Sequence, residues 1–300
     1  MERGFHAGER AVQQRAGTRA EADRLAGMLD EPDLRSGLGQ FLAERTFAGL
    51  AARDTDGRLW ISPVTGTPGF LRPTSATTLR IGTQPAAGDP LHGLPADQPA
   101  GLLAIEFARR RRARINGTLT AAGPDGLTIA VEQAYGNCPQ YIQQRVLAPG
   151  TTARTSGPVV RTAALTPDDA ALIAGADTLL LGTTHPDGGN DASHRGGPAG
   201  FVRVVDEHRL WWPDYPGNNM FNSFGNLAVD PAAALLFVDF AAGRALHLSG
   251  SARVEWTTGP GDDGATGRRV VFDLEAVVAG VPLPLRAGEV EPYRRNPALT

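Results

Sequence analysis

The stretch from residue 191 to residue 226 holds the side chains best suited to chemistry. It reads DASHRGGPAGFVRVVDEHRLWWPDYPGNNMFNSFGN, and two runs typical of strands, VRVV and RLWW, separate two polar loops. Arginine forks onto phosphate oxygens, and glycine lets the backbone approach a ligand closely. The stretch therefore predicts a site for a phosphate-bearing cofactor. The candidate residues are Ser193, Arg195, Gly196 and Gly197 in the first loop and Asp214, Gly217, Asn218, Asn219, Asn222, Ser223 and Asn226 in the second.

Each of these residue types also has a structural interpretation. Pro-Gly-Asn-Asn is a turn sequence that tolerates positive φ, and arginines on strands commonly solvate an exposed face. The aromatic residues Trp211, Trp212 and Tyr215 form core more often than they stack on a ligand.

Composition restricts the chemistry that the chain can perform. All 29 basic residues are arginine, so a lysine Schiff base and a lysine-dependent phosphate loop are both excluded. The six histidines show no HxxxH or HxH spacing, so no metal site is predicted. The single cysteine, Cys138, excludes an internal disulfide.

Charge and hydropathy give no sign of a nucleic-acid or membrane partner. The formal net charge is -3, no apolar run is long enough to span a membrane, and MERGFHAGER lacks the apolar core of a signal peptide. A cytoplasmic protein is the expectation.

The elements that must position the candidate site come from an internal repeat. Residues 56–81 align without a gap to residues 187–212, and residues 101–117 align to residues 233–250. Within each copy a further strand candidate follows the second aligned block, at 127–135 and at 270–278. Each copy has about six short strands, the pattern of a small antiparallel barrel. The chain is therefore predicted to be mainly β, with two tandem barrels and accessory helices.

We divide the chain into a helical leader at 1–45, a first barrel at 46–150 and a second barrel at 160–290. The leader is rich in Ala, Leu, Glu and Arg at helical spacing and is expected to pack across the first barrel or sheet. Residues 162–176 predict a connecting helix with Thr166 as its N-cap. The asparagine-rich loop exists only in the second copy, which should therefore hold most of the cofactor.

At these residues the chain resembles the pyridoxamine 5'-phosphate oxidase-like group, the FMN-binding split barrels. The block from GGPAGFVRVVD to AAALLFVDF resembles that group's strand, phosphate-loop, helix and strand order, and GNCPQYIQQR at 136–145 resembles the signature of one branch. The resemblance implies a pseudo-dimer of two split barrels that binds FMN, with FAD or a deazaflavin as alternatives.

The resemblance also implies which residues bind the cofactor. Phosphate ligands are expected on the third strand and in the loop after it, and the isoalloxazine ring is expected near residues that precede that strand. The partner barrel would contribute a helix start within GNCPQYIQQR. The implied residues are Ser193, Arg195, Gly196, Phe201, Arg203, Pro213, Asp214, Asn218, Asn219, Asn222 and Asn226, with Asn137, Tyr141, Gln143 and Arg145 from the first barrel.

The expected function is a flavin-dependent oxidoreductase acting on a small organic substrate, with NAD(P)H as a candidate donor and a homodimer as a candidate assembly. The alternative is a binding protein that carries flavin, deazaflavin or haem without turnover. Three other features carry weaker hypotheses. Cys138 is a redox thiol, a flavin neighbour or buried packing. The run from Arg109 to Arg114 is a solvated turn or a patch that docks an anionic partner or a nicotinamide phosphate, and His247 is an acid/base or a core histidine.

Overall fold

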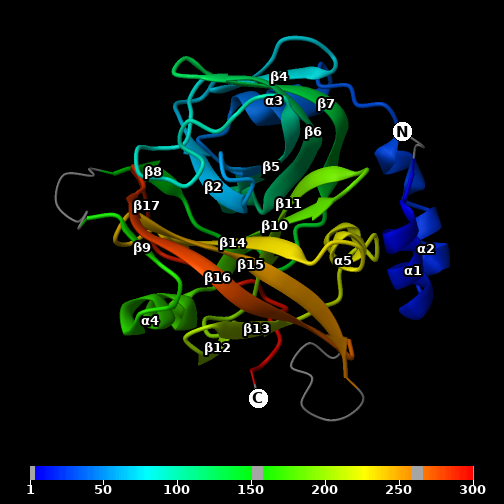
Figure 1. Cartoon of the computed structure of the whole chain (residues 1–300). Helices are drawn as coiled ribbons and strands as arrows, with labels where there is room; N and C mark the ends of the chain where they lie inside the picture. Colours follow the sequence, from blue (N-terminus) through cyan, green and yellow to red (C-terminus); the bar gives the residue numbers. More distant parts are fainter. Residues whose placement is uncertain (1–3, 151–157, 258–265, 300) are drawn as a thin grey trace.

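The computed structural model describes residues 4–150, 158–257 and 266–299. It is mainly β, as predicted, and two large antiparallel sheets dominate it. In Figure 1 the sheet from the first half of the chain lies above the sheet from the second half, and the helices lie at the periphery.

The first barrel is one sheet of order β2-β1-β5-β6-β7-β4-β3. Its strands are β1 (Phe47–Arg53), β2 (Leu59–Thr65), β3 (Leu71–Pro73), β4 (Thr78–Ile81), β5 (Gln98–Glu106), β6 (Arg111–Gly123) and β7 (Gly126–Asn137). The long β6–β7 hairpin turns at Gly123-Pro-Asp-Gly, where Gly126 has φ +115°, a value that side chains disfavour.

The second barrel repeats this order as β11-β10-β14-β15-β16-β13-β12. Its strands are β10 (Thr178–His185), β11 (Gly189–Gly196), β12 (Arg203–Asp206), β13 (Arg209–Pro213), β14 (Ala232–Asp239), β15 (Arg244–Trp256) and β16 (Arg268–Pro282). Every strand of the first sheet has its counterpart at the matching place in the second. The predicted duplication is therefore confirmed.

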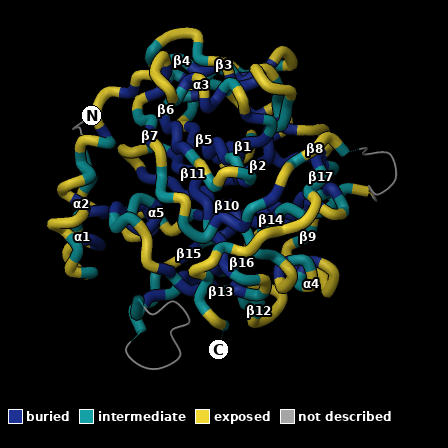
Figure 2. The backbone as a smooth tube through the Cα atoms, turned by 180° about the vertical axis from the view of Figure 1, so that it is seen from behind, coloured by how far each residue is buried: buried dark blue, intermediate teal, exposed yellow. Residues whose placement is uncertain are grey.

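The two barrels meet about a pseudo-twofold axis. A Cβ on Gly49 would lie 2.5 Å from Leu180, and a Cβ on Gly182 would lie 3.2 Å from Ala51. In the repeat alignment residue 49 is equivalent to 180 and residue 51 to 182, so equivalent positions face one another, as at the axis of a symmetric dimer. Figure 2 shows the buried strands running through this contact.

Helices and minor strands surround the barrels. The helices are α1 (Ala7–Arg15), α2 (Arg19–Asp23), η1 (Ala26–Leu29), α3 (Gly37–Ala43), η2 (Phe107–Arg109), α4 (Pro167–Gly175) and α5 (Asn222–Leu227). Strand β9 (Val160–Thr162) extends the second sheet, and β8 (Leu147–Pro149) pairs with β17 (Leu285–Ala287). Thr166 caps α4 through a capping box with Asp169, as predicted.

Helix α1 packs on α5, the short helix after the ligand loop. A Cβ on Gly8 would lie 2.3 Å from the carbonyl oxygen of Gly225, and a Cβ on Gly225 would lie 2.6 Å from the amide nitrogen of Glu9. The helices therefore approach so closely that only glycine fits at the crossing. Gln13 fixes the contact by donating a hydrogen bond to the carbonyl of Met220 at 3.0 Å.

Two local predictions were wrong. Residues 191–196, expected in a loop, form most of β11, because their polar side chains find partners across the barrel interface. The helix start expected within 136–145 is a turn and an isolated bridge, since Pro139 lies there and Tyr141 has φ +62°.

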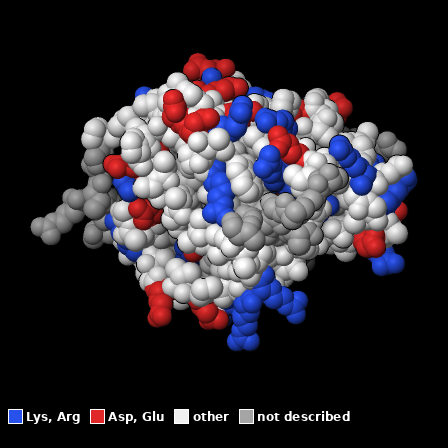
Figure 3. Space-filling model, turned by 90° about the horizontal axis from the view of Figure 1, so that it is seen from below, with Lys and Arg blue, Asp and Glu red and all other residues white. Residues whose placement is uncertain are grey.

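The described part of the chain contains no helix that is long and apolar enough to cross a membrane. On the face shown in Figure 3, arginine and acidic side chains are interspersed among uncharged residues.

Candidate functional site

A cavity at the interface of the barrels collects arginines from both. It consists of two adjoining pockets that share Arg114, Arg195 and Asp214, and the larger has about 670 Å³ of space including its open part. We call it the cationic cavity. The larger pocket is lined by Leu103, Arg112, Arg114, Asn137, Cys138, Gln140, Tyr141, His194, Arg195, Gly196, Phe201, Pro213, Asp214, Tyr215, Gly217 and Asn218.

The first barrel supplies its arginines from β6. Residues 112 and 114 are two apart on one strand, so their side chains leave the same face, toward β11 of the second barrel. Arg114 forms a buried ion pair with Asp191, whose carboxylate oxygens lie 3.1 and 3.2 Å from Nη1. Asp191 also accepts hydrogen bonds from Ser223 at 3.2 Å and Asn116 at 3.3 Å. Burial lowers the pKa of Arg114, but Asp191, Tyr135 and Glu9 together outweigh this effect and raise that pKa.

Arg112 fixes the protonation of His194. Its Nε donates to the carbonyl of Cys138 at 2.9 Å, and its Nη1 lies 2.8 Å from Nδ1 of His194. Since arginine can only donate, Nδ1 must accept, and the proton of the neutral imidazole is on Nε2. Burial, reinforced by the charges of Arg112 and Arg195, lowers the pKa of His194 well below its usual value. His194 is therefore a neutral donor.

Positive charge is in excess in the cavity. Among the described residues neither Arg112 nor Arg195 forms an ion pair with a carboxylate. Of the described residues that line the larger pocket, only Asp214 is acidic, and it pairs with Arg268 at 2.8 Å. Burial and the neighbouring Arg114 and Arg195 lower the pKa of Arg112 to about 9. Burial also lowers the pKa of Arg195. An anion in the cavity would relieve this repulsion.

Several buried polar atoms around the cavity have no hydrogen-bond partner among the described residues. Three are donors, namely Nε of Arg114, Nε of Arg195 and Nε2 of His194. Two are acceptors, Oδ1 of Asn137 and Oε1 of Gln140. A buried polar atom without a partner costs about 1–3 kcal/mol. Their gathering around one cavity indicates a polar ligand there.

The loop after β13 closes the second pocket. Asn218 accepts a hydrogen bond from the amide of Met220 at 3.2 Å, and Asn219 adopts φ +60°. These features are those of a tight turn, so part of the asparagine pattern reflects turn geometry. Both residues nevertheless line the pocket, as do Arg195, Asp214 and Arg268.

The structure brings together about two thirds of the residues expected from the sequence. Those that line the cationic cavity are Asn137, Tyr141, Arg195, Gly196, Phe201, Pro213, Asp214, Asn218, Asn219 and Asn222. The rings of Tyr141 and Tyr215 lie 5.0 Å apart and give the cavity an aromatic wall. Trp212, by contrast, is core.

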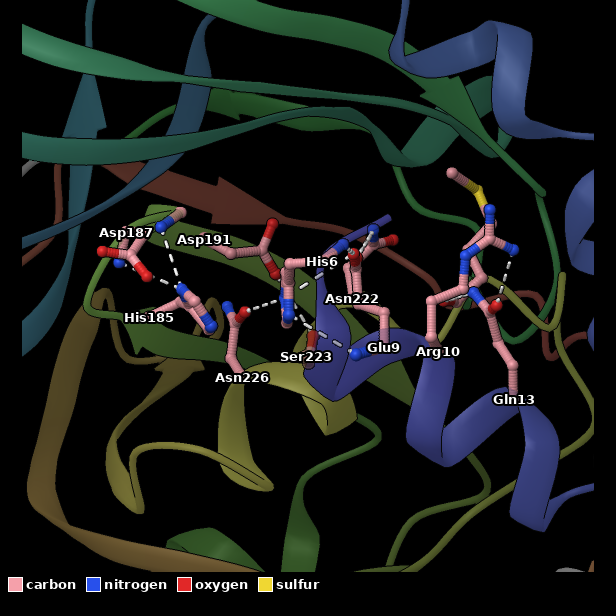
Figure 4. Close-up of polar contacts among 12 residues, drawn as sticks. His6, Glu9, Arg10, Gln13, His185, Asp187, Asp191, Asn222, Ser223 and Asn226 are labelled. Carbon is pink, nitrogen blue, oxygen red and sulfur yellow. Dashed lines mark hydrogen bonds and ion pairs between the residues drawn. The ribbon is translucent and has the colours of Figure 1, made fainter. Parts of the chain in front are cut away.

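Helix α1 engages two of the asparagines (Figure 4). Asn222 donates to Oε1 of Glu9 at 2.5 Å, and Asn226 accepts from Nε2 of His6 at 3.0 Å while it donates to Thr183. Asn226 does not line the cationic cavity among the residues described.

Four other expected residues lie outside the lining of the cavity as the structure describes it. Ser193 is buried on β11 and accepts a hydrogen bond from Ser223 at 3.0 Å. Arg203 lies on β12. Gln143 binds the C-terminal segment through Tyr293 and Asn296, and Arg145 forms an ion pair with Asp177 at 2.6 Å.

The interpretation of the run from Arg109 to Arg114 as a solvated turn was wrong for two residues. Arg109 and Arg111 are exposed beside the turn, but Arg112 and Arg114 lie on β6 and line the cavity. Their alternation, continued by Asn116, is a strand signal that the charge of the run obscured. Cys138 also lines the cavity and is partly exposed.

The pseudo-equivalent place in the other half is filled by protein. There His247, the counterpart of Arg114, lies 3.5 Å from Asp89, and Ser62, the counterpart of Ser193, donates to Asp89 at 2.6 Å. All three side chains are buried, and burial raises the pKa of Asp89 and lowers that of His247. His247 is therefore a core histidine at the barrel interface, and it contacts Asp89 of the loop between β4 and β5.

A family model described as pyridoxamine 5'-phosphate oxidase matches residues 165–279. No curated protein sequence matches the chain. The cationic cavity is thus built from strands and a loop of the matched region, together with β6 and residues 137–141 of the first barrel.

Solved structures similar to parts of the chain include HupZ of Group A Streptococcus, with 12% identity over 39% of this chain and 98% of that chain, at a TM-score of 0.32. A Clostridium acetobutylicum protein related to general stress protein 26, of the pyridoxinephosphate oxidase family, has 16% identity over 41% of this chain and 92% of its own, at 0.29. HutZ, a heme storage protein from Vibrio cholerae, has 14% identity over 39% and 96%, at 0.28. At these scores the structures add no argument about function.

Proposed function

We propose that the chain, whose residues 165–279 match the pyridoxamine 5'-phosphate oxidase family model, binds one flavin, FMN, in the cationic cavity and uses it as an oxidoreductase of a small organic substrate. The observation that carries the proposal is the gathering of unpartnered donors on Arg114, Arg195 and His194 around a cavity with excess positive charge.

The residues present fit a flavin mononucleotide. The phosphate carries negative charge, which suits the second pocket with Arg114, Arg195 and Arg268. An isoalloxazine ring is flat and apolar with carbonyl acceptors at its edge, which suits the first pocket, where Phe201, Tyr141 and Tyr215 lie beside the His194 donor. FAD or a deazaflavin would offer a similar ring edge.

The donor set favours flavin over haem. An imidazole that ligates iron must present an unprotonated nitrogen to the metal. Nδ1 of His194 is engaged by Arg112, and Nε2 carries the proton.

When bound, a flavin supplies the transfer of electrons or hydride, and the protein supplies binding, orientation and electrostatics. The side chains of Arg112, Arg114 and Arg195 stabilise negative charge in the cavity. The hydrogen bond from Arg112 keeps His194 neutral and its Nε2 proton directed for donation. Leu103, Phe201 and the two tyrosines exclude water from the inner wall.

The test is the visible spectrum of protein purified without added cofactor, with mass spectrometry of what heat releases. We expect flavin absorption and an FMN mass. Anaerobic NAD(P)H should bleach the bound flavin, and an oxidised substrate or dioxygen should restore it. A Soret band or no chromophore after reconstitution would overturn the binding proposal, and flavin that binds but never cycles would identify a carrier.

Variants test the site. Arg195→Met should raise the FMN Kd tenfold to a hundredfold, because a hydrogen bond from a charged group contributes about 1.5–3 kcal/mol. The control, Arg209→Met, removes an exposed arginine of the same barrel that pairs with Asp273 and should leave Kd unchanged. Equal Kd values for the two variants would place the flavin elsewhere.

A further inference from the structure

A second cavity lies beside helix α1, on the far side of Asp191 from the cationic cavity. It has about 1360 Å³ of space including its open part, and its lining includes Phe5, His6, Glu9, Asn116, His185 and Asp191. A smaller neighbour of about 740 Å³ shares Asn116, Gln133, Asp187 and Gly188 with it. We call the pair the acidic cavity. The close-up in Figure 4 shows His6, Glu9, Asp191 and Asn222 gathered where α1 meets β11 and α5.

The acidic cavity has the opposite charge to the cationic cavity. Its two parts are lined by the carboxylates of Glu9, Glu132, Asp187 and Asp191, and no arginine lines either part among the described residues. The Arg114–Asp191 ion pair lies at the boundary, with Arg114 facing one cavity and Asp191 the other. Asn222 lines both.

The two histidines do not cancel this negative charge. Burial and the neighbouring His185 lower the pKa of His6 to about 4, so His6 is neutral at physiological pH. Nδ1 of His185 accepts hydrogen bonds from the amides of Asp187 and Gly188 at 3.1 and 2.9 Å, as an unprotonated nitrogen does.

Asn116 provides an acceptor without a partner among the described residues, and Glu9 provides a buried carboxyl group whose oxygens accept from the amide of His6 and the side chain of Asn222. Asn116 is 8% exposed; its Nδ2 donates to Asp191, and its Oδ1 has no partner among the described residues. Burial, together with the charge of Asp191, raises the pKa of Glu9 to about 7. Two carboxylates close together in a buried site repel one another, and a bound cation removes that repulsion.

We propose that the acidic cavity binds a small organic cation with a primary ammonium group, held by Glu9, Asp191 and Asn116. An ammonium group has three donors and no acceptor, which complements two carboxylates and an unpartnered carbonyl. The volume leaves space for the organic part of the ligand, and Phe5 offers it an apolar surface. This site is separate from the flavin site and does not depend on it.

The test is calorimetric titration of the whole protein, with its cofactor content as purified, at pH 8. The probes are putrescine and n-butylamine, and n-butanol is the uncharged control. We expect the amines to bind at least tenfold more tightly than the alcohol. Binding should weaken at pH 6, because Glu9 then keeps its proton. The other charged or titratable groups beside the ligand are His6, His185, Asp187 and Asp191, and Arg114 lies behind Asp191. Equal binding of amine and alcohol, or no binding at millimolar amine, would overturn the proposal.

Two variants make the test specific. Glu9→Gln removes one carboxylate, and Asn116→Leu removes the free acceptor from a strand of the first barrel, where it has no part in capping α1. Each should weaken amine binding at least tenfold. Glu21→Gln changes an exposed residue of α2 and is the matched control. The site would be refuted if Asn116→Leu kept its affinity for the amine and a folded Glu9→Gln also still bound the amine. The flavin spectrum of each variant reports separately on the cationic cavity.

Discussion

Replacing Arg114 by methionine would leave the carboxylate of Asp191 buried without its cation. Asp191 is 3% exposed, so water cannot take the place of the guanidinium. Removing one partner of a buried ion pair costs about 3–5 kcal/mol. Asp191 would keep its hydrogen bonds from Ser223 and Asn116, which places the expected loss at the lower end, about 3 kcal/mol.

The assay is urea unfolding followed by tryptophan fluorescence. With an m value of about 3 kcal/mol/M, a loss of about 3 kcal/mol lowers the midpoint by about 1 M. The double variant Arg114→Met with Asp191→Asn removes the buried charge and should recover most of the loss. An unchanged midpoint for Arg114→Met, or a double variant no more stable than the single one, would refute the buried-charge argument.

The same two variants separate stability from binding. Both lack the Arg114 donor that faces the cationic cavity, so both should bind FMN more weakly even though their stabilities differ. Recovery of FMN affinity in the double variant would show that Arg114 acts on the cavity only through the fold.

Two further predictions concern pH and stoichiometry. Burial raises the pKa of Glu9 from 4.5 to about 7. Between these two pH values the folded protein holds a proton that the unfolded chain has released. The free energy of unfolding therefore falls by about 3 kcal/mol as the pH rises through this window. Melting curves from pH 4.5 to 8 should show a smaller fall for Glu9→Gln than for the native protein or Glu132→Gln, and parallel curves would contradict the buried carboxyl. Because Asp89 and His247 fill the second interface site, we expect one flavin per chain. The variant Asp89→Asn should leave that ratio unchanged. Two flavins per chain, measured by absorbance, would show that the filled site opens.

Local patterns in the sequence determined the barrels. Strand alternation and turn residues depend on residues close together in the chain, and each aligned block keeps one offset between the two copies. These patterns predicted β5 and β14, and likewise β7 and β16, at matching places, but they did not predict β11. The cap of α4 by Thr166 is equally local. The helix expected within 136–145 failed because proline and a left-handed Tyr141 outweighed the helix-compatible residues around them.

Tertiary contacts decided which polar residues face a ligand. Arg114 meets Asp191 across 77 residues of sequence, and Asn222 meets Glu9 across 213, so neither partnership leaves a periodic signal. The repeat made two interface sites equivalent in sequence, but the packing of Asp89 against His247 filled one of them. The sequence alone therefore determined that two barrels form and that one loop is rich in ligand-binding residue types. Only the folded chain decided that Arg112 and Arg114 complete that site, because the position of a side chain across an interface depends on packing between segments that are far apart in the chain.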